Sequence, residues 1–312
     1  MNPIASIIIP TRGGAERLPR LFAALEEQSD KDFEVVPVVD GDIDGSEDVI
    51  RDWSRRSSLR IRPVVLPSNQ GRSAALNAGL EHADGEVLIR CDDDLGPAPD
   101  YVAGHVGRHR ESEGLVGIVG PYRNVLPDTP YARSYGRLAA ERSLKDVFNC
   151  SPDEAWRLWA GNVSVRRAAA DRVGPYDESY RGYGWEDVDY GYRLHMAGIP
   201  VLVAPELTAE HYMGATTTRL RTLRALHAGA ARRRFHDRHG IRAEASPVTP
   251  WRSLVRGTST VVTERSLAVA SDAVDAISDR LPAKVSEKLV ALLVESADVA
   301  GVRHPERAGS RF

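Results

Sequence analysis

The chain has 312 residues, of which 42% are apolar and 27% are charged. This composition is typical of a globular chain long enough for one or two domains, and it excludes a disordered, collagen-like or coiled-coil protein. The 41 Lys and Arg residues against 44 Asp and Glu residues give a net charge of −3, so no overall basic field attracts nucleic acid.

The two cysteines, Cys91 and Cys150, lie far apart and outside any CxxC spacing. They indicate neither a disulfide framework nor a zinc site, and they fit a reducing compartment. The apolar run Ile4–Ile9 is too short for a signal peptide, and there is no uninterrupted apolar stretch of about 18 residues. We therefore expect a cytoplasmic protein without a transmembrane segment.

Short apolar runs alternate with segments of helical spacing in the N-terminal part of the chain. The runs are continuously apolar, as expected of strands that are buried on both faces of a parallel sheet. The expected order is strand Ile4–Ile9, helix Glu16–Gln28, strand Phe33–Val39, strand Arg60–Leu66, helix Ser73–His82 and strand Glu86–Arg90. This order predicts an α/β fold with a largely parallel sheet.

Polar loops follow three of these strands, at Pro10–Gly14, Asp40–Gly45 and Asp92–Asp94. Ligands of open α/β sheets bind at the carboxyl ends of the strands, so we expect the three loops to converge on one crevice. The adjacent carboxylates of Asp92–Asp94 repel each other unless a cation or solvent offsets their charge. Mg²⁺ or Mn²⁺ suits such oxygen ligands, and a solvated acidic turn is the alternative.

A glycine-rich segment, Gly182–Trp185, leads into Glu186 and Asp187 at the start of a predicted helix. Carboxylates are stabilised at a helix N-terminus, so helix capping explains them without any chemistry. The alternative is a carboxylate that acts as a general base in the crevice. Farther along the chain, His211 is a structural residue unless the fold brings it to the aspartates, where it would be a metal ligand.

Two segments concentrate positive charge. Asn69–Ser73 opens a helix with Arg72 positioned for a phosphate, although an ordinary capped helix explains it equally. Arg219–Arg242 contains eight arginines and one acidic residue. Its Arg232–Arg234 triplet forms either a solvated face or a site for a diphosphate or an anionic lipid.

The composition changes beyond about residue 245, where Ser, Ala and Val dominate. Ser266–Leu281 and Val285–Val299 have helical spacing. We therefore expect a domain of residues 1–245 and a helical extension of residues 246–312. The GxGxxG, GxxxxGK[ST], HExxH and GxSxG motifs are absent, which argues against dinucleotide-dependent dehydrogenases, P-loop enzymes, zinc proteases and α/β-hydrolases.

In combination, the motifs resemble those of the inverting family 2 glycosyltransferases over residues 4–215. In chain order they are SIIIPTR, VVDGD with DGS, NQGRSAALNAG, the DDD triplet, WAGNVSVRR, VGPYDESYRGYGWEDVDYGYRL and His211. The resemblance implies the GT-A fold, a mostly parallel central sheet flanked by helices that binds a nucleotide-diphosphate sugar. The Gly-Trp-Glu-Asp form is most similar to the galactosyltransferase-like and chondroitin-polymerase-like branch.

The resemblance also implies roles for single residues. Those expected to contact the donor nucleotide or its sugar are Pro10, Thr11, Arg12, Asp40, Arg72, Asp92, Asp93, Gly161, Asn162 and Trp185. Among them, Asp40 would hydrogen-bond the uracil, and Trp185 would form an apolar wall under a sugar ring. The family often has Asp-Asp where this chain has Asp40-Gly41, so one contact is either lost or supplied by Asp42.

Metal binding and catalysis are implied in the same way. Asp94, Asp92 and His211 would hold Mn²⁺ or Mg²⁺, with Asp94 as the most direct ligand. Asp187 would be the general base that removes the proton of an acceptor hydroxyl, and Glu186 would contact the acceptor or the donor sugar. Attack on the face opposite the leaving diphosphate inverts the anomeric centre and requires no covalent intermediate.

The expected partners are a nucleotide-sugar donor, with a UDP-sugar favoured, and a carbohydrate, lipid-linked or small-molecule acceptor. Peripheral membrane contact and a homo-oligomer stay open. One alternative is an inactive member that binds nucleotide and metal in a regulatory role. The other is a sugar-phosphate nucleotidyltransferase, which shares the fold and releases pyrophosphate, although Arg12-Gly13-Gly14 only partly matches its loop.

Overall fold

The computed structural model describes residues 2–212, 214–241 and 247–309, which form two compact units. The first unit contains the chain up to Asn124 together with Ser143–Ser179 and Glu186–Tyr212. The second unit contains Val125–Arg142, Tyr180–Trp185 and the chain from Met213 onward. The chain therefore passes between the units more than once.

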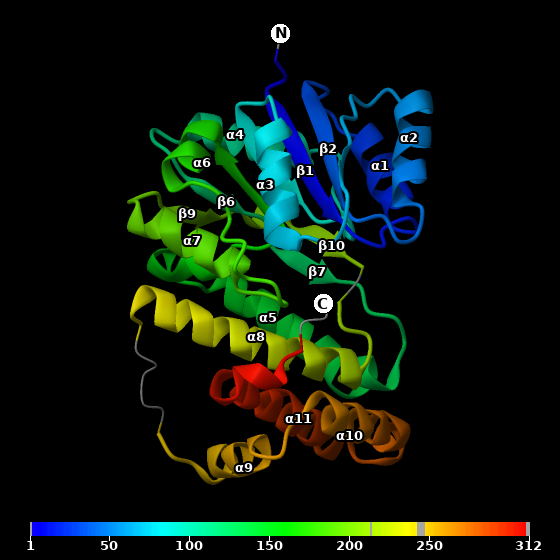
Figure 1. The fold of residues 1–312 in the computed structure, drawn as a ribbon, viewed down its shortest axis with the longest axis vertical. Coiled ribbons are helices and arrows are strands. Elements are labelled where there is room, and N and C mark those ends of the chain that lie inside the picture. The colour runs from blue at the N-terminus through cyan, green and yellow to red at the C-terminus, as the bar shows by residue number, and fades with distance from the viewer. Residues whose placement is uncertain (1, 213, 242–246, 310–312) are drawn as a thin grey trace. The chain divides into compact units, whose positions relative to one another are not determined.

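A seven-stranded sheet is the centre of the first unit, with the strand order β3-β2-β1-β4-β8-β6-β9 (Figure 1). β1 pairs in parallel with β2 and β4, β2 pairs in parallel with β3, and β8 runs antiparallel to β4 and β6. The strands are β1 Ala5–Thr11, β2 Phe33–Asp40, β3 Val64–Leu66, β4 Val87–Cys91, β6 Gly117–Val119, β8 Asn162–Arg166 and β9 Val201–Val203. The predicted α/β fold with a largely parallel sheet is confirmed.

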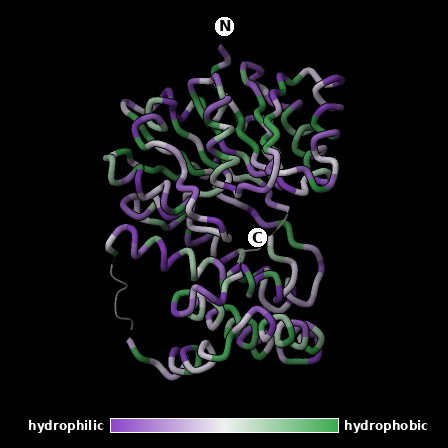
Figure 2. Tube along the Cα trace, in the orientation of Figure 1, coloured by the Kyte–Doolittle hydropathy of each residue, from purple (hydrophilic) through white to green (hydrophobic). Residues whose placement is uncertain are grey.

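Helices pack on both faces of this sheet, which explains the continuously apolar strands. Ile9 of β1 packs with Leu21 and Val102 on one face, whereas Val38 of β2 packs with Ala75 on the other. Figure 2 shows the apolar central strands. The helices that lie wholly in this unit are α1 Leu18–Glu26, α2 Ser46–Arg56, α3 Arg72–His82, α4 Tyr101–Glu111, α6 Arg167–Val173, α7 Glu186–Met196 and the 3₁₀ helices η2 Pro152–Leu158 and η3 Pro205–Leu207.

Helix α3 approaches the sheet closely at a glycine. A Cβ atom at Gly79 would lie 2.3 Å from Cγ2 of Ile8 and 3.2 Å from Cγ2 of Val38. Real carbon atoms do not come so close, so any larger residue would push α3 away from β1. Because Arg72 is the first residue of α3, this packing also sets the position of one predicted site residue.

A second, three-stranded sheet forms from short strands in the order β5-β10-β7. They are β5 Leu95–Gly96, β7 Tyr122–Asn124 and β10 Ala209–His211. In the antiparallel β10–β5 pair His211 lies opposite Leu95, and in the parallel β10–β7 pair it lies opposite Asn124. This register brings His211 to the residue that follows Asp94.

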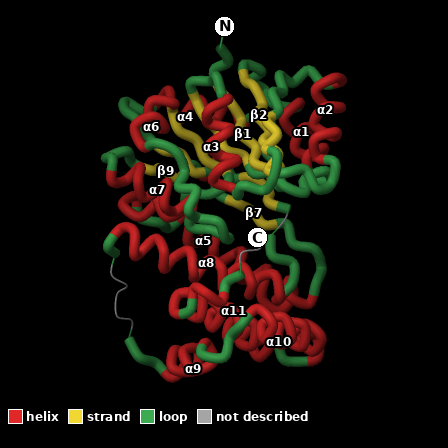
Figure 3. The backbone as a smooth tube through the Cα atoms, viewed as in Figure 1, coloured by secondary structure: helices red, strands yellow, loops and turns green. Residues whose placement is uncertain are grey.

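The regular elements among the described residues of the second unit are all helices, joined by loops (Figure 3). Its core joins Leu226 to Val290 and Val294. Two glycines let the longest helices meet backbone to backbone, because a Cβ at Gly229 or Gly301 would lie 2.2 Å or 2.0 Å from a carbonyl oxygen of the other helix. The helices are η1 Ala132–Gly136, α8 Thr218–His239, α9 Pro250–Ser259, α10 Glu264–Ile277, η4 Ser278–Arg280, α11 Ala283–Arg303 and η5 Pro305–Arg307, and α5 Arg137–Phe148 has residues in both units.

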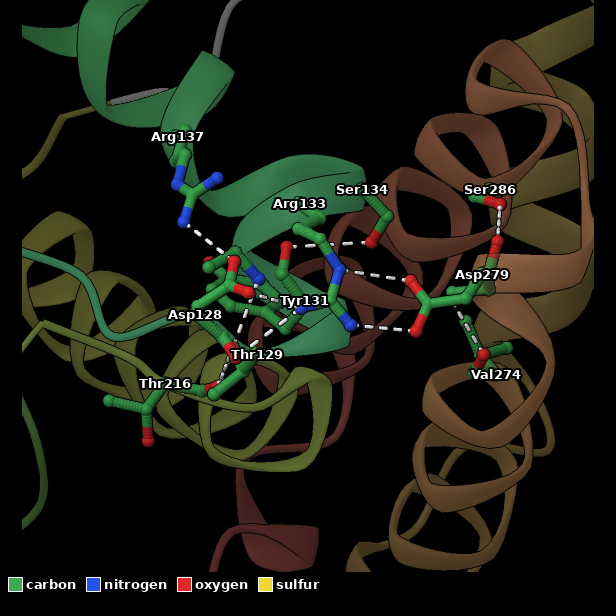
Figure 4. A network of polar contacts seen from close by, with 12 residues as sticks. Asp128, Thr129, Tyr131, Arg133, Ser134, Arg137, Thr216, Val274, Asp279 and Ser286 are labelled. Carbon is green, nitrogen blue, oxygen red and sulfur yellow. Dashed lines mark hydrogen bonds and ion pairs between the residues drawn. The ribbon is translucent and has the colours of Figure 1, made fainter.

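A polar network joins η1 and the start of α5 to η4 and to the segment before η1 within this unit (Figure 4). Arg133 donates to Asp279 Oδ2 at 2.7 Å and to Asp128 Oδ2 at 2.9 Å, and Arg137 donates to Asp128 Oδ1 at 2.8 Å. All four side chains are exposed, and exposed ion pairs contribute little to stability. The network orients the helices more than it stabilises them.

Both C-terminal helices predicted from the sequence are present, as α10 and α11. The expected domain boundary after residue 245 falls in residues 242–246, outside the described residues, and stays a prediction. The compact units differ from it, because α8 precedes residue 245 but packs along α11 in the second unit. No helix in the described residues is both long and apolar enough to cross a lipid bilayer.

Candidate active site

The three loops predicted to converge do meet. The Thr11 hydroxyl, at the end of β1, donates to Asp93 Oδ2 at 2.5 Å. The backbone N–H of Ala15, just beyond the first loop, donates to Asp44 Oδ2 at 2.9 Å. The loops after β1, β2 and β4 therefore form one continuous edge, and this edge is the candidate site.

Asp93 is the residue that ties this edge together. Besides Thr11, it accepts hydrogen bonds from Arg17 Nε at 3.0 Å and Arg17 Nη2 at 2.8 Å. Burial raises the pKa of Asp93 above its ordinary value, although Arg17 and Thr11 act in the opposite direction. A Cβ at Gly14 would lie 2.0 Å from Thr11 Oγ1, so only glycine fits beside this contact. Asp93 thus fixes the loops, and its implied contact with ribose or metal stays a prediction.

Asp92 faces a buried arginine that the sequence analysis did not single out. Arg90 of β4 is 4% exposed and donates from Nε to Asp92 Oδ1 at 2.9 Å. Burial acts to raise the pKa of Asp92, but the charges of Arg90 and Arg72 outweigh it and hold the pKa below its ordinary value. A Cβ at Gly161 would lie 2.1 Å from Asp92 Cγ, so the glycine leaves room for this carboxylate.

Asp94 faces His211 across the small sheet. Oδ2 of Asp94 lies 3.2 Å from Nε2 of His211, and Nδ1 of His211 lies 2.5 Å from the side-chain oxygen of Asn124. Since Asn124 Oδ1 can only accept, Nδ1 carries a proton, and in the neutral ring Nε2 is a lone-pair donor directed at a carboxylate. An ion pair with a protonated His211 ring accounts for this contact, and so does a cation held by the two side chains.

The chemistry of this pair fits a divalent cation. Asp94 Oδ1 is buried and has no hydrogen-bond partner in the described part of the chain, so it can serve as a ligand. The described residues contain no group of three or more His, Cys, Asp or Glu side chains placed to hold a metal. Asp92 is paired with Arg90 instead, and its expected role as a third ligand stays a prediction. Mg²⁺ and Mn²⁺ commonly take few protein ligands and complete their coordination with phosphate oxygens and water.

Arg90 also reaches the predicted base. Its Nη1 donates to Oδ1 of Asp187, the second residue of α7, whose side chain is 13% exposed. Burial raises the pKa of Asp187 to about 7, and the nearby charge of Glu186 adds to the effect, whereas Arg90 opposes it. Arg90 thus places Asp187 beside Asp92, on the same edge as the acidic loop.

Glu186 and Arg72 form a second ion pair at this edge. Arg72 Nη1 donates to Glu186 Oε1 at 3.1 Å. Glu186 is 2% exposed, and its Oε2 has no hydrogen-bond partner in the described part of the chain. The first residue of α3 is thereby joined to the first residue of α7, and one carboxylate oxygen remains for a ligand.

Asp40, Pro10 and Arg12 are also expected to contact the donor nucleotide, and they differ in burial and in hydrogen bonding. Asp40 accepts hydrogen bonds from the backbone N–H groups of Gln70 at 2.6 Å and Gly71 at 2.9 Å, which fix the loop before α3. Pro10 is half-buried and Arg12 is exposed. Their implied nucleotide contacts stay predictions.

Asn162 faces the protein interior. Its side-chain N–H group donates to the Leu207 carbonyl at 2.9 Å, and its Oδ1 lies 3.2 Å from His105 Nε2. Burial lowers the pKa of His105 to about 3, so this histidine is neutral. Asn162 therefore supports the strand beside Gly161, and its implied part in the donor loop stays a prediction.

Trp185 belongs to the second unit. Its ring packs against Phe235 at 5.1 Å and against His236 at 6.1 Å between ring centroids, and its φ angle of 71° is the one positive value among the described residues other than glycine. Such a backbone conformation persists only where packing holds it. Its expected role as a wall under a sugar ring stays a prediction.

Three residues of the site were not predicted from the sequence: Arg90, Asn124 and Arg17. A signal exists for Arg90, since it is the one charged residue in the apolar run VLIRC, and a buried charge implies a partner. Asn124 and Arg17 carry no such signal. Asn124 reaches His211 only through the pairing of β7 with β10, which is not visible in the sequence.

Known proteins are similar to this chain in sequence and in fold. The model of the family described as glycosyl transferase family 2 matches residues 6–174. A validoxylamine A glucosyltransferase of Streptomyces hygroscopicus is 30% identical over an alignment of 231 residues. The match covers 65% of this chain and 54% of that protein. An undecaprenyl-phosphate 4-deoxy-4-formamido-L-arabinose transferase of Pseudomonas syringae is 29% identical over 190 residues. This match covers 59% of this chain and 48% of that protein. The matches span about half the length of these curated relatives.

Solved structures share the fold. A mannosyltransferase from Pyrobaculum calidifontis, in complex with GDP-Man and Mn²⁺, superposes with a TM-score of 0.67 at 18% identity over 98% of this chain and 88% of that one. Residues 1–349 of TarS from S. aureus, in complex with UDP-GlcNAc, give a TM-score of 0.54 at 16% identity. This superposition covers 100% of this chain and 94% of that one. The fold expected from the sequence, GT-A, is confirmed.

Proposed function

Because this chain belongs to glycosyl transferase family 2, we propose that it moves a sugar from a nucleotide-diphosphate donor to an acceptor hydroxyl, with a divalent cation and with Asp187 as the general base. The family membership makes it a glycosyltransferase. The metal, the base and the inversion of the anomeric centre belong to the proposal.

One observation carries the proposal: Arg90 contacts both Asp92 and Asp187. A base is useful only if it lies within reach of the donor carbon, and the donor phosphates require the cation side of the site. Arg90 puts the carboxylate of α7 next to the acidic loop that carries Asp94. The base and the expected metal ligands therefore lie on one edge of one unit.

The chain's own residues perform the following steps. Arg90 donates a hydrogen bond to Oδ1 of Asp187, which leaves Oδ2 to accept the proton of the acceptor hydroxyl. The hydroxyl oxygen then attacks the anomeric carbon of the donor sugar. Arg72 lies at the start of α3, where a guanidinium and helix N–H groups both attract phosphate. Glu186, held by Arg72, offers Oε2 to a sugar hydroxyl.

Asp94 and His211 would hold the cation, and Asn124 fixes the ring of His211 for that task. A bound Mg²⁺ or Mn²⁺ would offset the negative charge that develops on the leaving diphosphate. The Mn²⁺ in the P. calidifontis complex supports this part of the proposal.

The donor nucleotide and the acceptor are the least constrained parts. We keep a UDP-sugar as the favoured donor, and the likeness to a protein that binds UDP-GlcNAc supports it, whereas the P. calidifontis protein binds GDP-Man. The names of the relatives refer to validoxylamine A and to undecaprenyl phosphate. The assay below therefore includes both small-molecule and lipid-linked acceptors. Cytoplasmic location, membrane contact and oligomeric state stay predictions.

The experiment is a turnover assay with a panel of UDP-, GDP- and dTDP-sugars, Mn²⁺ and a panel of acceptors, in which released nucleoside diphosphate is measured. We expect one donor to give metal-dependent release. Asp187→Asn should lower kcat by about 10²- to 10⁴-fold, because the general base is lost, while donor binding remains. Asp52→Asn, at an exposed carboxylate of α2, is the matched control and should keep full activity.

Two results would count against this function. Release of pyrophosphate instead of a nucleoside diphosphate would indicate a nucleotidyltransferase. Full activity of Asp187→Asn would remove Asp187 from the role of base.

A further inference from the structure

A cavity of about 210 Å³ lies within the second unit, formed by α8, η5 and the Tyr180–Trp185 segment. Small residues leave the space: Gly182, Ala230, Ala231, Ala308 and Gly309 line it. The volume is large enough for several water molecules or a small polar ligand. None of the side chains assigned to the donor, the cation or the base lines it, although Gly182 opens the segment that leads into Glu186.

The charged residues on the wall are two arginines, Arg181 and Arg234. A histidine, His227, also lines the cavity, and its Nε2 lies 3.0 Å from Glu264 Oε1. The same oxygen accepts a hydrogen bond from the Gly309 N–H at 2.8 Å, so Glu264 is held at the wall by two donors. Each of the two lining arginines carries a positive charge, and the Glu264 carboxylate lies beside His227.

The structure separates the members of the arginine triplet in α8. Arg232 donates to Asp298 at 2.5 Å, and Arg233 donates to Asp237 at 2.8 Å. Arg234 alone of the three lines the cavity. The triplet is thus two ion-paired arginines that stabilise the helix surface and one arginine that faces a space of ligand size.

We propose that this cavity binds a phosphate group, carried by a phosphate ester or diphosphate, between Arg181 and Arg234. Guanidinium groups match the oxygens of a phosphate with paired N–H donors, and each such bond between two charged groups is stronger than a neutral one. The small residues leave room for the group to enter, and the Glu264 contact keeps His227 and Gly309 in place around it. This site is distinct from the nucleotide contacts of the first unit and does not depend on the proposed sugar transfer.

The test is calorimetric titration of the full chain with inorganic pyrophosphate in EDTA, so that no divalent cation contributes. We expect saturable binding to one site. Arg181→Ala and Arg234→Ala should each weaken binding about tenfold or more, and the double variant should lose it. Melting temperatures of the variants show that they remain folded.

Matched controls separate this site from other positive charge. Arg233→Ala changes the neighbouring arginine, which does not line the cavity, and should bind pyrophosphate as the unaltered chain does. Asp52→Asn, at an exposed carboxylate of α2, should also bind it equally. Absence of saturable binding, or equal loss in Arg233→Ala and Arg234→Ala, would overturn the proposal.

A second arm identifies the source of the phosphate. Sedimentation with phosphatidylcholine vesicles that contain phosphatidic acid, compared with vesicles without it, measures binding to a lipid headgroup. The cavity is assigned to a lipid phosphate if the chain sediments with the acidic vesicles, if pyrophosphate prevents this sedimentation and if Arg234→Ala abolishes it. Binding of pyrophosphate without such retention assigns it to a soluble phosphate ester. Either result supports a phosphate site only if the two arginines are required.

Discussion

Arg90 links the two carboxylates on which the proposed chemistry depends. Arg90 lies between Asp92 and Asp187, and its charge together with that of Arg72 outweighs the effect of burial and holds the pKa of Asp92 below its ordinary value. Arg90 does not prevent burial from raising the pKa of Asp187 to about 7. One carboxylate is thus suited to remain charged and the other to exchange a proton near neutral pH.

This difference predicts the pH dependence of the reaction. Asp187 must be deprotonated to act as a base, and its raised pKa means that it takes up a proton as the pH falls through about 7. We expect kcat/KM to fall tenfold for each unit of pH below that value and to level off above it. A pH–rate profile at saturating metal measures this, and a profile that stays flat down to about pH 5 would contradict the assignment.

Gly161 offers a second test at a single residue. An alanine there would place its Cβ within 2.1–2.6 Å of the Asp92 carboxylate, which must then move away from Arg90. We expect Gly161→Ala to weaken donor binding about tenfold and also to lower the free energy of unfolding, because the contact of Asp92 with the buried Arg90 is disturbed. Binding of the nucleoside diphosphate is the measurement.

Gly114→Ala is the matched control for Gly161→Ala, because a Cβ at Gly114 meets no atom within 4 Å. If both variants bind the nucleotide as tightly as the unaltered chain, Asp92 does not contribute to the donor site.

The sequence predicts the acidic and polar members of the site better than the groups that position them. Asp187 and Asp94 stand out because their neighbours form unusual patterns. By contrast, the contacts of Asp93 depend on Arg17, which lies in an ordinary helical segment. The inward direction of Asn162 depends on His105 and the Leu207 carbonyl. Such contacts join positions far apart in the chain, and local patterns do not contain them.

At the scale of elements, the close packing of α3 on β1 makes a definite prediction. Gly79→Ala should lower the free energy of unfolding by about 1–3 kcal/mol, because its Cβ would overlap Ile8. Gly107→Ala, in the middle of α4 with no atom within 4 Å of the added Cβ, should instead raise it by about 0.4–1 kcal/mol. Denaturant unfolding of the two variants measures the contrast, and equal stabilities would contradict the packing described.

Strong local patterns explain which elements are predictable. Most residues of β1, β2 and β4 are apolar, and the predicted strands overlap them. The helix α8 shows no single apolar face because it carries many arginines, and its helical structure is stabilised by packing on α11. Short strands such as β5 and β10 have only two or three residues, too few for a periodic pattern.

At the scale of the whole molecule, the packing of α8 on α11 predicts the effect of truncation. Leu226 of α8 is fully buried against a core that includes Val290 and Ala297 of α11. A chain that ends after residue 245 would expose this apolar surface. We expect it to aggregate or to melt at a lower temperature than the full chain. A monomeric, equally stable chain of residues 1–245 would contradict the second unit as described.

The measurement that tests the central claim most directly is calorimetric binding of UDP, GDP and dTDP in Mn²⁺ and in EDTA. It is made with the unaltered chain, Asp94→Ala and Asp187→Asn. The account predicts that one nucleotide binds only with Mn²⁺, that Asp94→Ala abolishes this binding and that Asp187→Asn retains it. Absence of binding in Mn²⁺, or binding that neither EDTA nor Asp94→Ala affects, would contradict the metal-assisted donor site.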